Sequence, residues 1–260
     1  MHDATATGPQ PLLVIADLHV SIGGREVLRG IDLAIHAGET HVLLGPNGSG
    51  KTTLFNTLAG IPGYEVTEGS VTFKGQDLLA LTIDERARLG IGVAFQRPPA
   101  VRGVRLRQVM EVAAAGTDAG AGADDIERIA ADLSVTDMLE RDVNLGFSGG
   151  EAKRSEMAQL LAQQPELALF DEPESGVDLD NIAVVGGAIA HLLKGDRASE
   201  RPRAGLIITH TGHILQYVNA DVGHVLFDGR LACEGNPLDL IDDIVGHGYE
   251  GCVECATCRQ

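Results

Sequence analysis

The stretch that decides the fold is Gly45-Pro46-Asn47-Gly48-Ser49-Gly50-Lys51-Thr52, which has the pattern G-x-x-x-x-G-K-T. The apolar run Thr40 to Leu44 precedes it and predicts a short buried strand. Residues Thr53 to Ala59 follow it and predict the start of a helix. This strand–loop–helix context is what a phosphate-binding loop requires. The sequence therefore predicts binding of a nucleoside triphosphate.

The residue types in this loop suit that chemistry. Glycines let backbone N–H groups surround phosphate oxygens, and the following helix N-terminus adds partial positive charge. Lys51 can reach the β- and γ-phosphates, and the Thr52 hydroxyl can ligate Mg²⁺. The alternative is a chance match in a chain with 33 glycines, but the strand, the lysine and the threonine together favour the phosphate loop. The predicted nucleotide-binding residues are Gly45, Pro46, Asn47, Gly48, Ser49, Gly50, Lys51, Thr52 and Thr53.

Composition excludes some function classes. The chain of 260 residues has a formal net charge of −17, which argues against sequence-independent binding to nucleic acid or to an anionic membrane. Residues Met1 to Thr5 lack the basic-then-apolar pattern of a signal peptide. The longest apolar stretch, Ile182 to Ala190, contains glycines and is too short to cross a bilayer. We expect a cytoplasmic protein.

The order of the predicted elements indicates an α/β fold with a mixed sheet. β-like runs at Leu12–Ile22 and Val27–Ile35 flank Gly23-Gly24 and predict an N-terminal antiparallel β subdomain, whereas later β/α units predict parallel strands. We expect a flexible N-terminus at 1–10, one domain at 11–245 with a helical subdomain inserted at about 97–164, and a cysteine-containing tail at 246–260.

Polar residues follow three predicted core strands, Gly92–Phe95, Leu167–Phe170 and Leu206–Thr209. They are Gln96, then Asp171 with Glu172, and then His210. An acidic pair after a strand is usually an exposed turn, and a lone histidine is usually structural. With a phosphate loop upstream, the three strand ends instead predict a site in which an acid holds the Mg²⁺ shell and a second acid orients the attacking water.

A fourth candidate lies before a predicted helix. Ser148 is suited to cap this helix, and Glu151, three residues later, completes a capping box. The simpler interpretation is a well-capped helix. Capping does not require two adjacent glycines, however, and Gly149 and Gly150 leave backbone N–H groups able to bind an anion.

Taken in order, these segments resemble the ABC-type ATPases over nearly the whole chain. The matching segments are 45–52, Gln96, 147–151, 167–172, 175–178 and His210. The resemblance implies an ABC-type P-loop fold that hydrolyses ATP to ADP and phosphate in a head-to-tail dimer. It also implies that Ser148, Gly149, Gly150 and Glu151 form a signature loop over the ATP of the other copy, and that Asp178 couples the two sites.

The same resemblance assigns catalytic roles. Glu172 is implied as the general base or water-orienting acid, His210 as the γ-phosphate contact, and Gln96 as a residue that positions water and Mg²⁺. Thr52 is implied to hold the metal directly and Asp171 through water.

Within this superfamily the chain is similar to the SufC-type ATPases of iron–sulfur cluster assembly. Phe147 and Glu151 stand where transporter ATPases usually carry Leu and Gln, and Glu174–Asp180 replaces the usual Thr-Ser-Ala-Leu-Asp. The resemblance implies a soluble partner similar to SufB or SufD, docked near Arg97–Val104. The alternative is the nucleotide-binding subunit of a membrane transporter, and Pro173 is a transporter-like departure. Ile22 occupies the place of an adenine-stacking aromatic, which implies that contact with the base is weaker or purely apolar.

The C-terminal cysteines raise a separate question. Cys252, Cys255 and Cys258 have the spacing of the first three cysteines of a ferredoxin-type cluster motif. They suggest an iron–sulfur or zinc site, with Cys233 or His247 as a fourth ligand. Since no fourth cysteine follows in the motif, a tail without any metal is the competing interpretation.

Overall fold

A six-stranded sheet forms the centre of the protein, in a computed structural model that describes residues 10–117, 120–194 and 202–254. Its strand order is β10-β9-β3-β8-β7-β6, and all neighbours are parallel except β10 with β9. The strands are β3 (Thr40–Leu44), β6 (Ile91–Ala94), β7 (Leu167–Asp171), β8 (Ala204–Ile208), β9 (Val222–Phe227) and β10 (Arg230–Gly235). The mixed sheet predicted from the sequence is confirmed.

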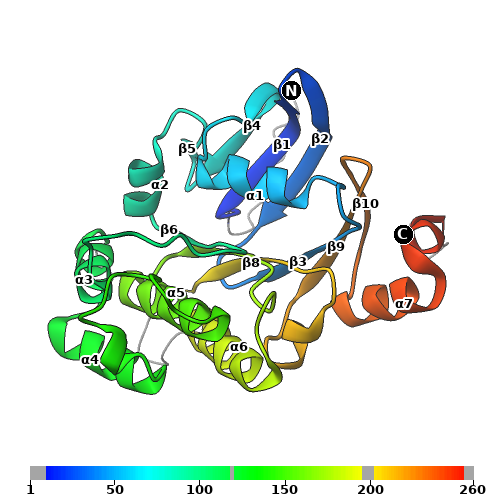
Figure 1. The fold of residues 1–260 in the computed structure, drawn as a ribbon. Coiled ribbons are helices and arrows are strands. Elements are labelled where there is room, and N and C mark those ends of the chain that lie inside the picture. Colours follow the sequence, from blue (N-terminus) through cyan, green and yellow to red (C-terminus); the bar gives the residue numbers. More distant parts are fainter. Residues whose placement is uncertain (1–9, 118–119, 195–201, 255–260) are drawn as a thin grey trace.

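A second, antiparallel sheet of order β2-β1-β4-β5 covers one side of the molecule. Its strands are β1 (Leu13–Ile22), β2 (Arg25–Ile35), β4 (Glu65–Phe73) and β5 (Gln76–Asp77). Ile22 pairs with Arg25 across the Gly23-Gly24 turn, as a two-residue hairpin requires. This sheet lies at the top of Figure 1, with α1 between it and the central sheet.

The helices divide between the two faces of the central sheet. In Figure 1, α5 and α6 lie below it, α3 and α4 lie at one end, and α7 lies beyond β9 and β10. The helices are α1 (Lys51–Ala59), α2 (Ile83–Leu89), α3 (Leu106–Ala115), α4 (Ala123–Asp132), α5 (Gly149–Gln163), α6 (Leu179–Lys194) and α7 (Pro237–Glu254), with short 3₁₀ turns η1 (Thr136–Met138) and η2 (His213–Gln216). The helical insertion expected at about 97–164 thus contains α3, α4, η1 and α5.

Alternating side chains of the central strands enter two hydrophobic cores. Val42 and Leu44 of β3 belong to the core shared with α5 and α6, whereas Leu43 belongs to the core shared with the antiparallel sheet and α1. All five residues of β3, β7 and β8 are buried, as expected for parallel strands covered on both faces.

Three parts of the fold differ from what the sequence indicated. Helix α2 was not expected, although Thr82 caps it and Glu85 completes a capping box. The stretch 113–123 is rich in alanine and glycine, which predicts a connection, yet Ala113–Ala115 belong to α3. The boundary expected at 246 lies within α7, which begins after Asn236 has capped its first turn and is interrupted by a kink at Gly248 (φ 73°, ψ 173°). Glycines 246, 248 and 251 lower helix propensity, so the burial of Leu240 and Cys252 supports this helix instead.

A pair of buried histidines joins β3 to β9. Nδ1 of His41 lies 2.9 Å from Nε2 of His224, and the stacked rings have centroids 5.1 Å apart. Nε2 of His41 lies 3.1 Å from a carboxylate oxygen of Glu39, and Nδ1 of His224 lies 3.5 Å from one of Glu234. A single proton between the rings joins them, whereas Nδ1 of His224 is buried without a hydrogen-bond partner, and a proton added there would be a buried charge.

This pair predicts acid sensitivity of the fold. Unfolded His224 takes up a proton below its ordinary pKa of 6.5, whereas burial, with a contribution from His41, lowers the pKa of the folded residue to about 4. Between these values only the unfolded state binds the proton, so the free energy of unfolding falls as the pH drops through this window. Acidification from about pH 7.5 to about pH 5 should remove about 2 kcal/mol through this residue.

Urea unfolding at the two pH values would check the prediction. We expect His224→Gln to lose less stability on acidification than the unmodified chain, and His213→Gln, at an exposed position, to lose as much. Equal losses in His224→Gln and in the unmodified chain would show that the pair is not the source.

Candidate functional site

The candidate site lies along the carboxyl edge of the central sheet. Adjacent strands β3, β8, β7 and β6 are parallel, so the segments that follow them meet at one edge. The phosphate loop follows β3, His210 follows β8, Glu172 follows β7 and Gln96 follows β6. Ligands of open α/β sheets bind outside this edge.

Glu172 is the centre of the predicted catalytic group. Gln96 donates from Nε2 to Oε2 of Glu172 at 2.5 Å, and Nδ1 of His210 lies 3.2 Å from Oε1. The structure therefore brings together three residues that are far apart in the sequence. The side chain of Glu172 is 12% exposed and that of His210 is 43% exposed, so the group opens towards solvent at the histidine.

The backbone of Glu172 adopts an unusual conformation. Its φ is 46°, in the left-handed region that non-glycine residues rarely adopt, at a cost of roughly 1–3 kcal/mol. Its N–H donates to the carbonyl oxygen of Ile208, and its carbonyl oxygen accepts from the N–H of Ser175. These two bonds hold the carboxylate at the end of β7, between the glutamine and the histidine.

The side chain of Lys51 bonds back to the backbone of the phosphate loop. Lys51 is 5% exposed, and its ammonium donates to the carbonyl oxygens of Gly45 and Pro46 at 2.7 and 3.0 Å. An ammonium has three donors, so one remains for a phosphate oxygen. Burial lowers the pKa of Lys51, with Glu172 and Asp171 partly opposing that effect.

Gly50 has a reason to lack a side chain. Its φ is 111°, and a Cβ there would lie 2.7 Å from a methyl group of Leu28.

A cavity of about 200 Å³ opens at the loop, lined by Val27, Asn47, Gly48, Gly50, Lys51, Thr52, Thr53 and Glu172. Among the described residues, the predicted loop and the predicted general base therefore share one cavity.

The donors expected to serve Mg²⁺ fit a hydrated magnesium ion. Oδ1 of Asp171 is buried without a hydrogen-bond partner, and Thr52, at the end of the phosphate loop, is exposed. Burial first and Glu172 second raise the pKa of Asp171 to about 6, which a nearby cation would reverse. Hard oxygen donors of this kind are the ligands that Mg²⁺ prefers.

A cavity beside the loop contains Ile22. It measures about 350 Å³ and is lined by Ile22, Arg25, Val27 and Gly48 together with Glu26, Arg29, Asp228 and Gly229. Ile22 is 41% exposed, so its side chain offers an apolar surface next to the phosphate loop.

The segment 148–151 begins α5 as a capping box. Glu151 N–H donates to Oγ of Ser148 at 3.3 Å, and Ser148 N–H donates to the Glu151 carboxylate at 2.7 Å. A Cβ on Gly149 would lie 2.5 Å from the carbonyl oxygen of Gly176, and one on Gly150 would lie 2.5 Å from the side chain of Asn181. The two glycines therefore allow close packing against the loop that carries Asp178. Asp178 itself accepts from the backbone and side chain of Asn181 at 2.9 Å.

Two residues of α5 were missed as site residues. Phe95, directly before Gln96, donates its N–H to Glu156 at 2.7 Å, and its carbonyl oxygen accepts from the ammonium of Lys153. Both charged side chains are buried, and desolvation raises the pKa of Glu156 to about 7. The sequence carried a signal for the burial of these two side chains. Lys153 lies one helical turn before the apolar Met157, and Glu156 lies one turn before the apolar Leu160.

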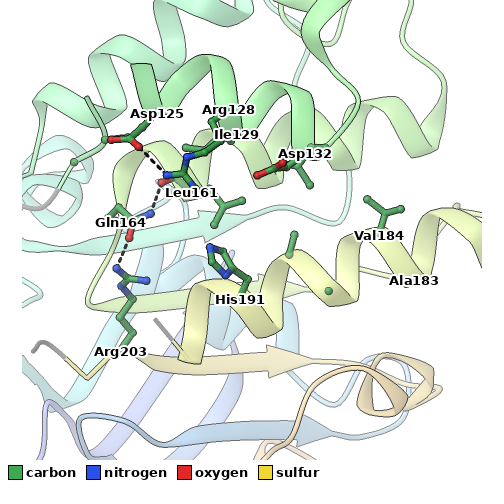
Figure 2. A pocket seen from close by; sticks show the side chains of 15 residues that line it. Asp125, Arg128, Ile129, Asp132, Leu161, Gln164, Ala183, Val184, His191 and Arg203 are labelled. Atoms are coloured by element: carbon green, nitrogen blue, oxygen red, sulfur yellow. Dashed lines mark hydrogen bonds and ion pairs between the residues drawn. The ribbon is translucent and has the colours of Figure 1, made fainter. Parts of the chain in front are cut away.

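Another cavity lies away from this edge. It measures about 710 Å³ and lies between α4, α5 and α6, where Figure 2 shows Asp125 with Arg128 and Gln164 with Arg203 on one side and His191 on another. Its described lining includes no residue of the phosphate loop or of the three catalytic strand ends.

Within 10–117, 120–194 and 202–254, no helix has the length and hydropathy needed to cross a membrane. In the same ranges, no three His, Cys, Asp or Glu side chains are grouped as a metal-binding cluster. Cys255 and Cys258 lie outside the described residues, and Cys252 is fully buried.

Similarity to known proteins agrees with this geometry. Residues 28–175 match the family described as ABC transporter. The chain is 41% identical to the "Probable ATP-dependent transporter SufC" of Escherichia coli (strain K12) over 248 residues, covering 92% of this chain and 97% of that protein. It is 38% identical to "Vegetative protein 296" of Bacillus subtilis (strain 168), with 92% of each chain covered.

Solved structures show the same fold. A nucleotide-free ATP-binding cassette from an ABC transporter superposes with a TM-score of 0.73 at 21% identity, covering 95% of this chain and all of that one. An ADP-bound cassette, MJ1267, gives 0.72 at 23% identity, covering 93% of this chain and 97% of the other. The chain therefore belongs to the ABC transporter family, as an ATPase similar to SufC.

Proposed function

We propose that this ATPase dimerises on ATP and drives a conformational change in a soluble scaffold for iron–sulfur cluster assembly, similar to SufB or SufD. The observation that carries the proposal is the 41% identity to SufC over nearly the full length of both chains. The proposal places the chain in the cytoplasm, where ATP is supplied.

The residues that differ from the usual transporter pattern support this assignment. Glu151 caps the backbone of Ser148, and the ring of Phe147 lies 4.7 Å from the guanidinium of Arg141. Lys153 holds the backbone before Gln96. The departures at Phe147 and Glu151 thus have partners within the fold.

In the proposed mechanism, Glu172 accepts a proton from the attacking water. The water oxygen forms a bond to the γ-phosphorus while the bond to the bridging oxygen of ADP breaks, and the proton passes to the carboxylate. Gln96, bonded to one oxygen of Glu172, orients that water. The ring nitrogen of His210 that does not face Glu172 is left to contact the γ-phosphate.

Other side chains neutralise the charge of the substrate. Lys51 binds the β- and γ-phosphates, and the N–H groups of the loop surround their oxygens. Thr52, Gln96 and Asp171 would hold Mg²⁺, which supplies charge neutralisation at the phosphate oxygens when bound.

The proposal requires a second copy of the chain. Ser148, Gly149, Gly150 and Glu151 do not line the described cavity at the phosphate loop, so one copy does not complete its own site. In a head-to-tail pair each signature loop would close over the ATP of the other copy, and Asp178, packed at the start of α6, would couple the two sites.

The scaffold would dock beside Gln96. A groove of about 270 Å³ lies there, lined by apolar residues of 93–101 and of α3, among them Phe95, Pro98, Pro99, Val101 and Val109. The segment Arg97–Val104 borders this groove. A partner bound there would act on Gln96 through the adjacent peptide.

A transporter subunit is the second candidate. Relatives in Streptococcus pyogenes that are 38% identical over 94% of their length carry the name "Probable ABC transporter ATP-binding protein". The hydrolytic chemistry would be the same, so the partner alone separates the two candidates.

Removing the charge of Glu172 tests the chemistry. Glu172→Gln should lower kcat by about 100-fold or more, since a general base typically contributes that much. ATP affinity should stay within about twofold, because the carboxylate is used for proton transfer rather than binding. ATP should then trap the variant as a dimer, seen by light scattering. Glu166→Gln, at the other end of β7, is the matched control. Normal turnover in Glu172→Gln would remove it from this role.

Purification of the tagged chain from its source cells, followed by mass spectrometry, tests the partner. A SufB-like scaffold is the expected partner, and a multi-spanning permease would overturn the proposal in favour of a transporter. Val101→Asp, at a residue 42% exposed in the groove, should weaken the recovered complex by about tenfold. Val245→Asp, on α7 and 81% exposed, should leave it intact. An unchanged yield with Val101→Asp would place docking elsewhere.

A metal site on the tail is a separate part of the proposal. Cys252 is a buried thiol, whereas Cys233 is disulfide-bonded. A site formed by Cys252, Cys255 and Cys258 with Cys233 or His247 would first require that disulfide to be reduced. Binding would require the last turn of α7 to unwind around Cys252. Iron and zinc analysis of anaerobically purified protein tests this, and a colourless chain without either metal would refute it.

A further inference from the structure

Glu174 is a buried acid that the mechanism above does not use. It lies two residues after Glu172, in the loop that continues to Asp178, and is 6% exposed. Its Oε1 accepts hydrogen bonds from the hydroxyl groups of Thr209 and Thr211, the latter at 3.0 Å. These two threonines flank His210 directly.

Thr209 organises the turn that carries the histidine. Its Oγ1 accepts from the backbone N–H of Thr211 at 3.2 Å and of Gly212 at 3.0 Å. Since that oxygen accepts both N–H groups, its hydroxyl proton is free to point at Glu174. The carboxylate therefore fixes the rotamer of Thr209, which in turn fixes the backbone on both sides of His210.

The position of Glu174 is unfavourable for folding alone. Its Oε2 is buried without a hydrogen-bond partner, and an unsatisfied buried oxygen of this kind destabilises the native state. Some compensation comes from Lys153, because Glu156, Asp171 and Glu174 all oppose the lowering of its pKa by burial. Hydrogen bonds that hold catalytic groups in place are a common use of buried polar side chains at active sites.

We propose that Glu174 is a positioning residue for His210. By holding Thr209 and Thr211, it keeps one ring nitrogen of the histidine against Glu172 and the other available to the γ-phosphate. It also joins two loops, so that movement of the segment with Glu172 and Asp178 carries His210 with it. This inference rests on the proposed role of His210 in hydrolysis.

Steady-state hydrolysis by the full chain provides the test. Glu174→Ala should lower kcat about five- to tenfold, the effect expected when about one hydrogen bond of positioning is lost. The KM for ATP should stay within about twofold, since the residue does not contact substrate. Glu174→Gln should retain most of the activity, because its amide oxygen can accept from both hydroxyls.

A double-substitution cycle separates positioning from general stability. In a His210→Ala background, Glu174→Ala should reduce kcat by less than about twofold further, because residues that act as a unit are not additive. A loss as large as in the unmodified chain would overturn the proposal, as would unchanged activity of Glu174→Ala. If His210→Ala alone hydrolysed ATP normally, the proposed role of His210 would fail instead.

Two further variants guard against misfolding. Thr211→Val removes one of the two hydrogen bonds at an exposed residue and should lower kcat in the same direction as Glu174→Ala, whereas Thr211→Ser should restore it. Glu166→Gln, which removes a carboxylate paired with Lys74 on the surface, should leave kcat unchanged. Normal kcat in a folded Thr211→Val variant would count against the proposal.

Discussion

The parallel pairing of β3, β8, β7 and β6 is the constraint on which the rest of the site depends. Because these strands point the same way, the loops that follow them meet at one edge of the sheet. Each of these segments contributes only some of the polar groups of the site, and no one of them forms the site alone. Both faces of the sheet must be covered for such strands to be stable, and the two hydrophobic cores provide that cover.

Glu172 lies at the centre of this arrangement. Its carboxylate receives Gln96 from one neighbouring strand and His210 from the other, and its backbone is held in a strained conformation by Ile208 of β8. A strain of this size is maintained only where surrounding structure determines the conformation. The buried strands on each side of β7 supply that rigidity, so the sheet holds the proposed catalytic group in place.

Buried charges connect this edge to the helical subdomain. Lys153 and Glu156 of α5 bind both backbone groups of Phe95, while the same helix begins at the proposed signature segment, 148–151. A displacement of α5 therefore reaches Gln96 through one residue. Buried ion pairs contribute little net stability, which favours a positional role for this one.

The sequence by itself determined the phosphate loop, the capping box and the polar ends of three strands, because local residue patterns encode them. It also indicated the mixed sheet and the antiparallel β subdomain through hydrophobic periodicity. Helices α2 and α7 were not predicted. In α7, tertiary burial outweighs the weak helix propensity of its sequence. Only the tertiary structure decided that Glu174 meets Thr209 and Thr211, and that Lys153 and Glu156 meet Phe95. Those contacts join segments separated by dozens of residues, and no local pattern records which buried acid will face which strand end.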